Sequence, residues 1–204
     1  MQRRDRSPAS EHREGGGIVI LRAHLFDNGA RIHDNRATVR PSAERLHQAL
    51  LIIDVQTSFS PPAWLIERIA ALLPLMPSVA TLELHNEDAV PFRRQLNWAP
   101  AEDDRCLVAA ERVFVKHGYA PSPETIAYLR SLAPERVLVC GIQADTCVLA
   151  AGFALFDAGL RPTLIADLVV GSSLDRSGAL GVRLWRHHFA HVVERHTDLL
   201  TAVR

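Results

Sequence analysis

Lysine is nearly absent from this chain: of the 23 lysine and arginine residues among 204, only Lys116 is a lysine. Arginine carries a broad, permanently charged fork, whereas a lysine ammonium is compact and shifts its pKa when it is buried. The two therefore cannot replace each other in a crowded reactive site. This scarcity makes Lys116 a candidate for chemistry. The alternative interpretation is chance survival of one lysine in an arginine-rich chain.

Net charge, long apolar runs and paired cysteines are missing as well. The 23 acidic residues balance the 23 basic ones, so the whole chain has no electrostatic attraction to nucleic acid or to an anionic membrane. No apolar run approaches the roughly 18 residues of a membrane helix, and residues 1–17 lack the apolar segment of a secretory signal. Cys106, Cys140 and Cys147 form no C-x-x-C pair and are odd in number. We therefore expect reduced thiols in the cytoplasm.

The remaining pattern predicts one globular domain behind a polar extension. Residues 1–45 are interpreted as an N-terminal extension, partly disordered, with a possible β-hairpin where the apolar run 18–25 meets an Asp-Asn-Gly turn. From residue 46 onward, strand and helix patterns alternate. The predicted strands are 50–53, 78–84, 113–116, 136–140, 162–166 and 190–194, and the predicted helices are 62–73, 122–132, 145–157 and 175–188. This alternation predicts a Rossmann-like three-layer α/β/α sandwich with a six-stranded parallel sheet.

Three reactive residue types fall at one edge of that predicted sheet. Asp54 ends the strand 50–53, Lys116 ends the strand 113–116, and Cys147 follows the strand 136–140 at the start of a helix. Ligands of open α/β sheets bind outside the carboxyl ends of the strands. We therefore expect a carboxylate, an ammonium and a thiol to converge on the same rim.

These three groups are suited to nucleophilic catalysis. A cysteine at a helix N-terminus beside an ammonium should have a pKa below the free value of about 8.5, which would make Cys147 nucleophilic at neutral pH. Asp54 could take the thiol proton and return it to a leaving amine. Backbone N–H groups in the turn 141–147 could bind the developing oxyanion. Taken singly, a buried cysteine is usually a small apolar side chain, and a strand-end aspartate is often a cap.

Three segments resemble the signatures of the isochorismatase-like cysteine hydrolases: residues 51–56 (LIIDVQ), 113–116 (VFVK) and 139–148 (VCGIQADTCV). The resemblance implies that residues 46–204 form a hydrolase domain with Asp54 as base, Lys116 as its electrostatic partner and Cys147 as nucleophile. It also implies a cis peptide bond between Ile142 and Gln143. The N–H groups of Gln143 and Cys147 would then form the oxyanion hole. Homo-oligomers, either dimers or tetramers, are the family expectation.

The chain also departs from the metal-using members of that family. Nicotinamidases of the family carry an Asp-x-His set after the second strand, and residues 82–86 (LELHN) lack the aspartate, so we predict no metal and no cofactor. The namesake isochorismatases generally lack the nucleophilic cysteine, so Cys147 favours C–N cleavage. Gln56, Phe59 and Trp98 are candidate pocket-wall residues, with ordinary packing as the alternative.

The leading hypothesis is a metal-independent hydrolase that cleaves an amide, carbamoyl or ureido C–N bond of a small molecule through a thioester on Cys147. Two other functions stay open. A catalytically silent homologue could use the same rim to bind a small metabolite or a protein partner. A thiol-based redox protein could pair Cys147 with Cys140, although seven positions across a turn make that geometry doubtful.

Overall fold

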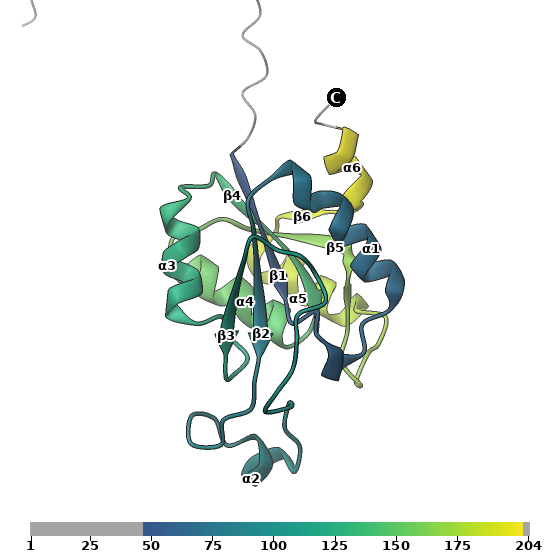
Figure 1. The fold of residues 1–204 in the computed structure, drawn as a ribbon. Coiled ribbons are helices and arrows are strands. Elements are labelled where there is room, and N and C mark those ends of the chain that lie inside the picture. The colour runs from purple at the N-terminus through teal and green to yellow at the C-terminus, as the bar shows by residue number, and fades with distance from the viewer. Residues whose placement is uncertain (1–46, 202–204) are drawn as a thin grey trace, which may run out of the picture. The chain divides into compact units, whose positions relative to one another are not determined.

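The computed structural model describes residues 47–201, which form a six-stranded parallel sheet between two layers of helices (Figure 1). The predicted extension at 1–45 and its hairpin lie outside these residues. The strands are β1 (Gln48–Ile53), β2 (Ser78–Glu83), β3 (Arg112–Lys116), β4 (Arg136–Ile142), β5 (Pro162–Val170) and β6 (Val192–Val193). The helices are α1 (Ala63–Leu72), α2 (Phe92–Leu96), α3 (Pro123–Ser131), α4 (Cys147–Asp157), α5 (Ala179–Phe189) and α6 (His196–Thr201), with short 3-10 turns at Thr57–Phe59 and Leu73–Leu75. The predicted fold class is confirmed.

Strand β1 lies inside the sheet, and its alternate side chains build two cores. Leu51 and Ile53 pack with the layer formed by α3, α4 and α5, whereas Leu50 and Ile52 pack with α1 and α6. A strand covered on both faces needs apolar residues at every position, which explains the continuous run in the sequence. No described helix is long and apolar enough to cross a membrane.

The strand order is β3-β2-β1-β4-β5-β6, and every pairing is parallel. The chain winds outward from β1 to β3, then crosses back to β4 on the other side of β1. The order therefore reverses between β1 and β4, and such a switch point opens a crevice at the carboxyl ends of the strands. Asp54 and the turn that leads to Cys147 leave the sheet on either side of this crevice.

Some predicted boundaries shift for local reasons. Helix α3 begins as predicted, with the Ser122 hydroxyl accepting the N–H of Thr125 at 3.4 Å. Helix α5 begins at Ala179 rather than at 175, because the Asp175 carboxylate accepts the N–H groups of Ser177 and Leu180 and closes a turn first. Strand β5 continues to Val170 through a register shift against β4. Helix α2 lies in the stretch 91–98, for which no helix was predicted.

Gly141 allows β4 to pass close to β1 directly beside Asp54. Its φ is +120°, and a Cβ there would press on the backbone oxygen of Ile53 and lie 2.7 Å from its nitrogen. Because the obstacle is backbone in the middle of the sheet, no side-chain rotation can relieve it. The crevice between β1 and β4 therefore requires a glycine at this position.

We expect Gly141→Ala to cost more than about 4 kcal/mol in the free energy of unfolding. Gly159→Ala is the matched control, because Gly159 also has a positive φ, +75°, but nothing lies within 4 Å of its Cβ position. That change should cost only the conformational term, about 1–2 kcal/mol. Urea unfolding of the two variants measures the difference, and equal losses would show that the close approach to Ile53 is unimportant.

Candidate active site

Four polar side chains meet at the carboxyl ends of β1, β2 and β3 and at the start of α4. Asp54 follows β1, Glu83 ends β2, Lys116 ends β3, and Cys147 is the first residue of α4. None is more than 5% exposed. The structure therefore brings together the three residues predicted from the sequence and adds a second carboxylate, Glu83.

The Lys116 ammonium is the centre of this group. Its Nζ lies 2.9 Å from Asp54 Oδ2 and 3.0 Å from Glu83 Oε2, and it donates a hydrogen bond of 2.6 Å to the carbonyl oxygen of Gly118. It also donates to the carbonyl oxygen of Tyr119 at 3.4 Å, so four oxygens surround the three donors of the ammonium. Burial alone would lower the pKa of Lys116, but the charge of Asp54 more than offsets this, and the pKa lies above its ordinary value. Lys116 is therefore held in its charged form.

Asp54 is fixed by a threonine on the neighbouring strand. The Thr81 hydroxyl donates to Asp54 Oδ1 at 2.7 Å and accepts the backbone N–H of Asp54 at 3.2 Å. Asp54 itself has a positive φ of 50°, which turns the chain out of β1 at this point. One carboxylate oxygen thus faces Thr81 and the other faces Lys116, so the carboxylate orientation is defined from two sides.

Gln56 lies beneath the site rather than in the pocket wall predicted for it. Its side chain is fully buried, donating to the carbonyl of Glu83 at 2.9 Å and accepting the N–H of Glu83 at 2.8 Å. It also donates to Asp104 Oδ2 at 2.8 Å. Gln56 therefore continues the pairing of β1 with β2 through its amide group and fixes the backbone from which Glu83 projects.

The Cys147 thiol donates to Glu83 Oε2 at 3.4 Å. It also lies within 4.8 Å of an Asp54 oxygen. Burial raises the pKa of the thiol well above its ordinary value, and the negative charge of Asp54 raises it further, while Lys116 opposes both. The low pKa expected from the helix N-terminus and the ammonium is therefore wrong for the resting site, because desolvation and the carboxylate outweigh them. Cys147 rests as a thiol and needs a base.

The turn before Cys147 contains two backbone N–H groups that have no protein acceptor among the described residues. The peptide bond between Ile142 and Gln143 is cis, as the resemblance implies. Within the turn, the N–H groups of Thr146 and Val148 donate to the carbonyl of Gln143. In the described part of the chain, the N–H groups of Gln143 and Cys147 donate to no protein acceptor. These are the two donors that were predicted for the oxyanion.

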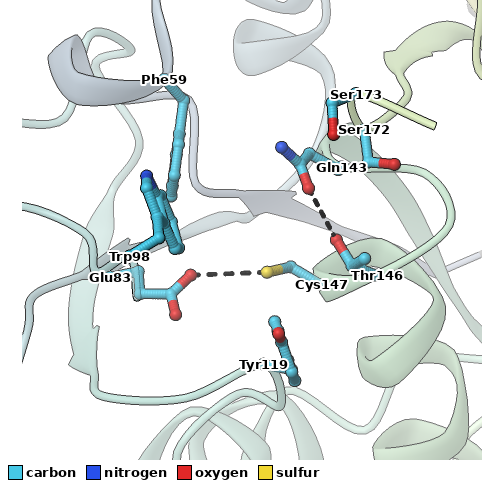
Figure 2. A pocket seen from close by; sticks show the side chains of 9 residues that line it. All are labelled: Phe59, Glu83, Trp98, Tyr119, Gln143, Thr146, Cys147, Ser172 and Ser173. Carbon is cyan, nitrogen blue, oxygen red and sulfur yellow. Dashed lines mark hydrogen bonds between the residues drawn. The ribbon is translucent and has the colours of Figure 1, made fainter. Parts of the chain in front are cut away.

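A pocket of about 430 Å³ opens over the sulfur (Figure 2). Phe59 and Trp98, both predicted wall residues, form one side with their rings stacked 6.2 Å apart. The buried Phe92 of α2 supports this side, with its ring edge against Trp98 at 5.9 Å and Tyr119 at 5.4 Å. The pocket therefore has an aromatic wall that is anchored by α2.

The opposite wall is polar and comes from Gln143, Thr146, Ser172 and Ser173 (Figure 2). Asp145 fixes it, since its carboxylate accepts the N–H and the hydroxyl of Ser172 at 2.8 and 2.6 Å. A bound molecule would thus place an apolar part against the aromatic rings and a polar part against this wall, with the thiol between them.

A model of the isochorismatase domain matches residues 48–197. The chain belongs to the isochorismatase-like hydrolase family. This confirms the family inferred from the three sequence segments and places the chain among enzymes. No curated protein matches it.

Solved structures of isochorismatase-like hydrolases share the fold at low sequence identity. The isochorismatase-like hydrolase of Alkaliphilus metalliredigens is 14% identical with a TM-score of 0.65, over 77% of this chain and 99% of that one. The pyrazinamidase of Pyrococcus horikoshii in complex with zinc is 20% identical with a TM-score of 0.61, over 72% and 98%. The N-carbamoylsarcosine amidase of Thermoplasma acidophilum is 19% identical with a TM-score of 0.60, over 73% and 96%.

The residues of this isochorismatase-like chain do not fit a metal ion. Within residues 47–201, three ligand-type side chains come within 4.8 Å of one another only at Asp54, Glu83 and Cys147. The Lys116 ammonium already lies against both of those carboxylates, so a cation there would face a buried positive charge. His85 is outside this cluster, and its Nε2 lies 3.1 Å from Glu87. The absence of a metal stays a prediction, and this donor set argues for it.

Sequence reasoning missed Glu83, Thr81 and Tyr119. Glu83 could have been found by the rule that located Asp54 and Lys116, since it is a charged residue at the end of a buried strand. Thr81 and Tyr119 carry no comparable signal, because their places depend on strand register and on the anchoring of α2.

Proposed function

We propose that this protein hydrolyses a C–N bond of a small amide, carbamoyl or ureido compound through a thioester on Cys147. The observation that carries the proposal is a buried group in which Lys116 pairs with Asp54, and Asp54 lies within 4.8 Å of the Cys147 thiol, which lines a pocket. The names of two structural neighbours, a pyrazinamidase and an N-carbamoylsarcosine amidase, support the amide class.

The reaction begins with proton transfer from the Cys147 thiol to Asp54. The thiolate adds to the substrate carbonyl carbon, and the resulting oxyanion accepts hydrogen bonds from the N–H groups of Gln143 and Cys147. The C–N bond then breaks, the leaving nitrogen gains a proton, and the acyl group remains on sulfur. Water attacks this thioester, the acid is released, and the sulfur recovers its proton. Lys116 keeps the site's charge balanced while the proton moves.

The pocket favours a small substrate with one flat or apolar part. That part would lie against Phe59 and Trp98, and polar substituents would face Thr146 and Ser172. Assembly into a dimer or tetramer stays a prediction. The three free thiols suit the reducing cytoplasm in which we expect the protein.

The test is ammonia release from nicotinamide, pyrazinamide and N-carbamoylsarcosine, combined with peptide mass spectrometry of acid-quenched enzyme. We expect turnover of at least one compound and an acyl adduct on the peptide that contains Cys147. Cys147→Ala should lose both signals. Cys106→Ala removes a thiol that donates a hydrogen bond to the carbonyl of Val108, and this variant should keep both signals.

Two outcomes would remove the proposal. A Cys147→Ala variant with wild-type turnover would show that the thiol is not the nucleophile. If the wild type releases no ammonia, and 4-nitrophenyl acetate leaves no acyl group on Cys147, the protein is a binding homologue without catalysis.

A further inference from the structure

The buried site contains one carboxylate more than its cation can balance. Asp54 and Glu83 are both fully or almost fully buried, and in the described part of the chain their side chains form ion pairs with Lys116 alone. Two ionised carboxylates, one ammonium and a neutral thiol would leave a net negative charge without solvent. A buried, uncompensated charge is costly, and such a site usually takes up a proton instead.

The contacts of their oxygens distinguish the two carboxylates. Asp54 Oδ1 accepts a hydrogen bond from the Thr81 hydroxyl, and Oδ2, which accepts no hydrogen bond from the described residues, lies 2.9 Å from the Lys116 ammonium as an ion pair. Both neighbours carry donors, as an ionised carboxylate requires. Glu83 places both its partners on one oxygen, because Lys116 Nζ at 3.0 Å and Cys147 Sγ at 3.4 Å both contact Oε2. Glu83 Oε1 is buried and has no hydrogen-bond partner among the described residues.

This pattern is that of a carboxylic acid whose proton is on the free oxygen. In such an acid, the carbonyl oxygen accepts hydrogen bonds and the hydroxyl oxygen needs an acceptor. Oε2 accepts from two donors, and Oε1 is the oxygen left to donate. Burial raises the pKa of Glu83, Lys116 opposes this, and the negative charge of Asp54 adds to it. Glu83 also lines the pocket beside the sulfur (Figure 2).

We propose that Glu83 is protonated on Oε1 in the resting enzyme and donates this proton to the leaving nitrogen. The inference rests on the proposed function, since it needs a C–N bond that breaks on Cys147. Asp54 and Glu83 then divide the proton transfers. Environments that move the pKa values of two neighbouring carboxyl groups apart are a general means of providing a base and an acid in one site.

Asp54 takes the Cys147 proton as sulfur bonds to the carbonyl carbon. When the tetrahedral intermediate collapses, the C–N bond breaks and the Oε1 proton of Glu83 moves to nitrogen, which leaves Glu83 as a carboxylate. This carboxylate next takes a proton from the water that attacks the thioester. The sulfur leaves the acyl carbon and recovers its proton from Asp54, so both carboxyl groups return to their first state.

An acid in this position matters for poor leaving groups only. An amine or ammonia leaves with difficulty unless nitrogen is protonated, whereas a nitrophenolate leaves without a proton. The expected substrates are therefore compounds with a basic leaving nitrogen. Loss of the Glu83 acid should slow the hydrolysis of such amides but not the acylation of Cys147 by activated esters.

Infrared spectroscopy tests the protonation without any substrate. At about pH 7, the wild type should show the C=O stretch of a protonated carboxyl group, and Glu83→Gln should lack it. Glutamate carrying ¹³C at the carboxyl carbon should shift this band, which assigns it to glutamate rather than to Asp54, even if Glu83→Gln fails to fold. A wild type without a glutamic-acid band overturns the proposal.

Kinetics test the proton transfer. Glu83→Gln keeps the size of the side chain but cannot give up a proton, so hydrolysis of the best amide should fall about 10²–10⁴-fold in kcat. Acylation of Cys147 by 4-nitrophenyl acetate should change by less than about threefold, a small fraction of that effect. Wild-type amide hydrolysis should also decline as pH rises through the pKa of Glu83, and Glu83→Gln should lack this decline. Glu102→Gln, the same change in an exposed residue paired with Arg93, is the control and should match the wild type.

The outcomes separate this inference from the proposed function. Equal losses on amide and ester would mean that Glu83 only positions Lys116 or Cys147, and the acid role would be wrong. If no amide is turned over while the glutamic-acid band is present, the proposed function fails and the protonation of Glu83 stands. A missing band with normal amide turnover removes the inference and leaves the function intact.

Discussion

Replacing Lys116 with methionine should lower the free energy of unfolding by about 3–5 kcal/mol at about pH 8, because it removes the only cation that pairs, among the described residues, with the buried Asp54 carboxylate. Methionine fills a similar volume, so lost packing contributes little. Arg112→Met is the matched control, since Arg112 lies on the same strand but is exposed. That change should stay within about 0.5 kcal/mol.

The pH dependence follows from the raised pKa of Lys116. A cation whose pKa is higher in the folded state stabilises fully below its unfolded value, about 10.4, and loses this effect as pH rises through the folded value. The wild type should therefore keep its advantage through neutral pH and lose it only in strong alkali.

Urea unfolding of both variants across this pH range measures these differences. Lys116→Arg adds a test of shape, because a guanidinium keeps the charge but cannot occupy the compact position between Asp54, Glu83 and the Gly118 carbonyl. If Lys116→Arg has wild-type stability and turnover, the single lysine of this arginine-rich chain survives by chance and its shape is not required. A Lys116→Met variant as stable at pH 8 as the wild type would mean that the buried Asp54 carboxylate does not depend on the Lys116 cation.

The sequence was sufficient to predict the rim on which the site is built. Asp54, Lys116 and the turn before Cys147 each follow an apolar strand, and parallel strands bring their carboxyl ends to one edge. Pattern alone therefore predicted which residues meet. It also predicted Phe59 and Trp98 in the wall, where the structure places them.

The energetics of the site could not be predicted in the same way. The pKa of Cys147 depends on how completely the thiol is buried and on which carboxylates face it, and neither follows from position at a helix start. The place of Gln56 depends on register, because its amide pairs with the backbone of β2 rather than facing the pocket. Such features require side-chain distances, which a linear pattern does not contain.

The second large effect concerns Asp54→Asn, which should change two measurements of Cys147 in opposite directions. Turnover of an amide should fall about 10²–10⁴-fold, because the base that takes the thiol proton is gone. Alkylation by iodoacetamide at about pH 7 should become faster, because the negative charge of Asp54 raises the pKa of the thiol and Lys116 remains beside it. Alkylation needs only the thiolate, and its iodide leaving group takes no proton.

Thr81→Val is the matched control for this variant. It removes the hydroxyl that orients Asp54 but keeps the carboxylate charge, so alkylation should not accelerate while turnover falls by less than in Asp54→Asn. Peptide mass spectrometry reports the alkylation rate at Cys147 against Cys140, whose complete burial raises its pKa as well. If Asp54→Asn slows alkylation and turnover together, Asp54 holds the thiol in place rather than acting as its base. Glu83, whose carboxyl group is hydrogen-bonded to the sulfur, would then be the base.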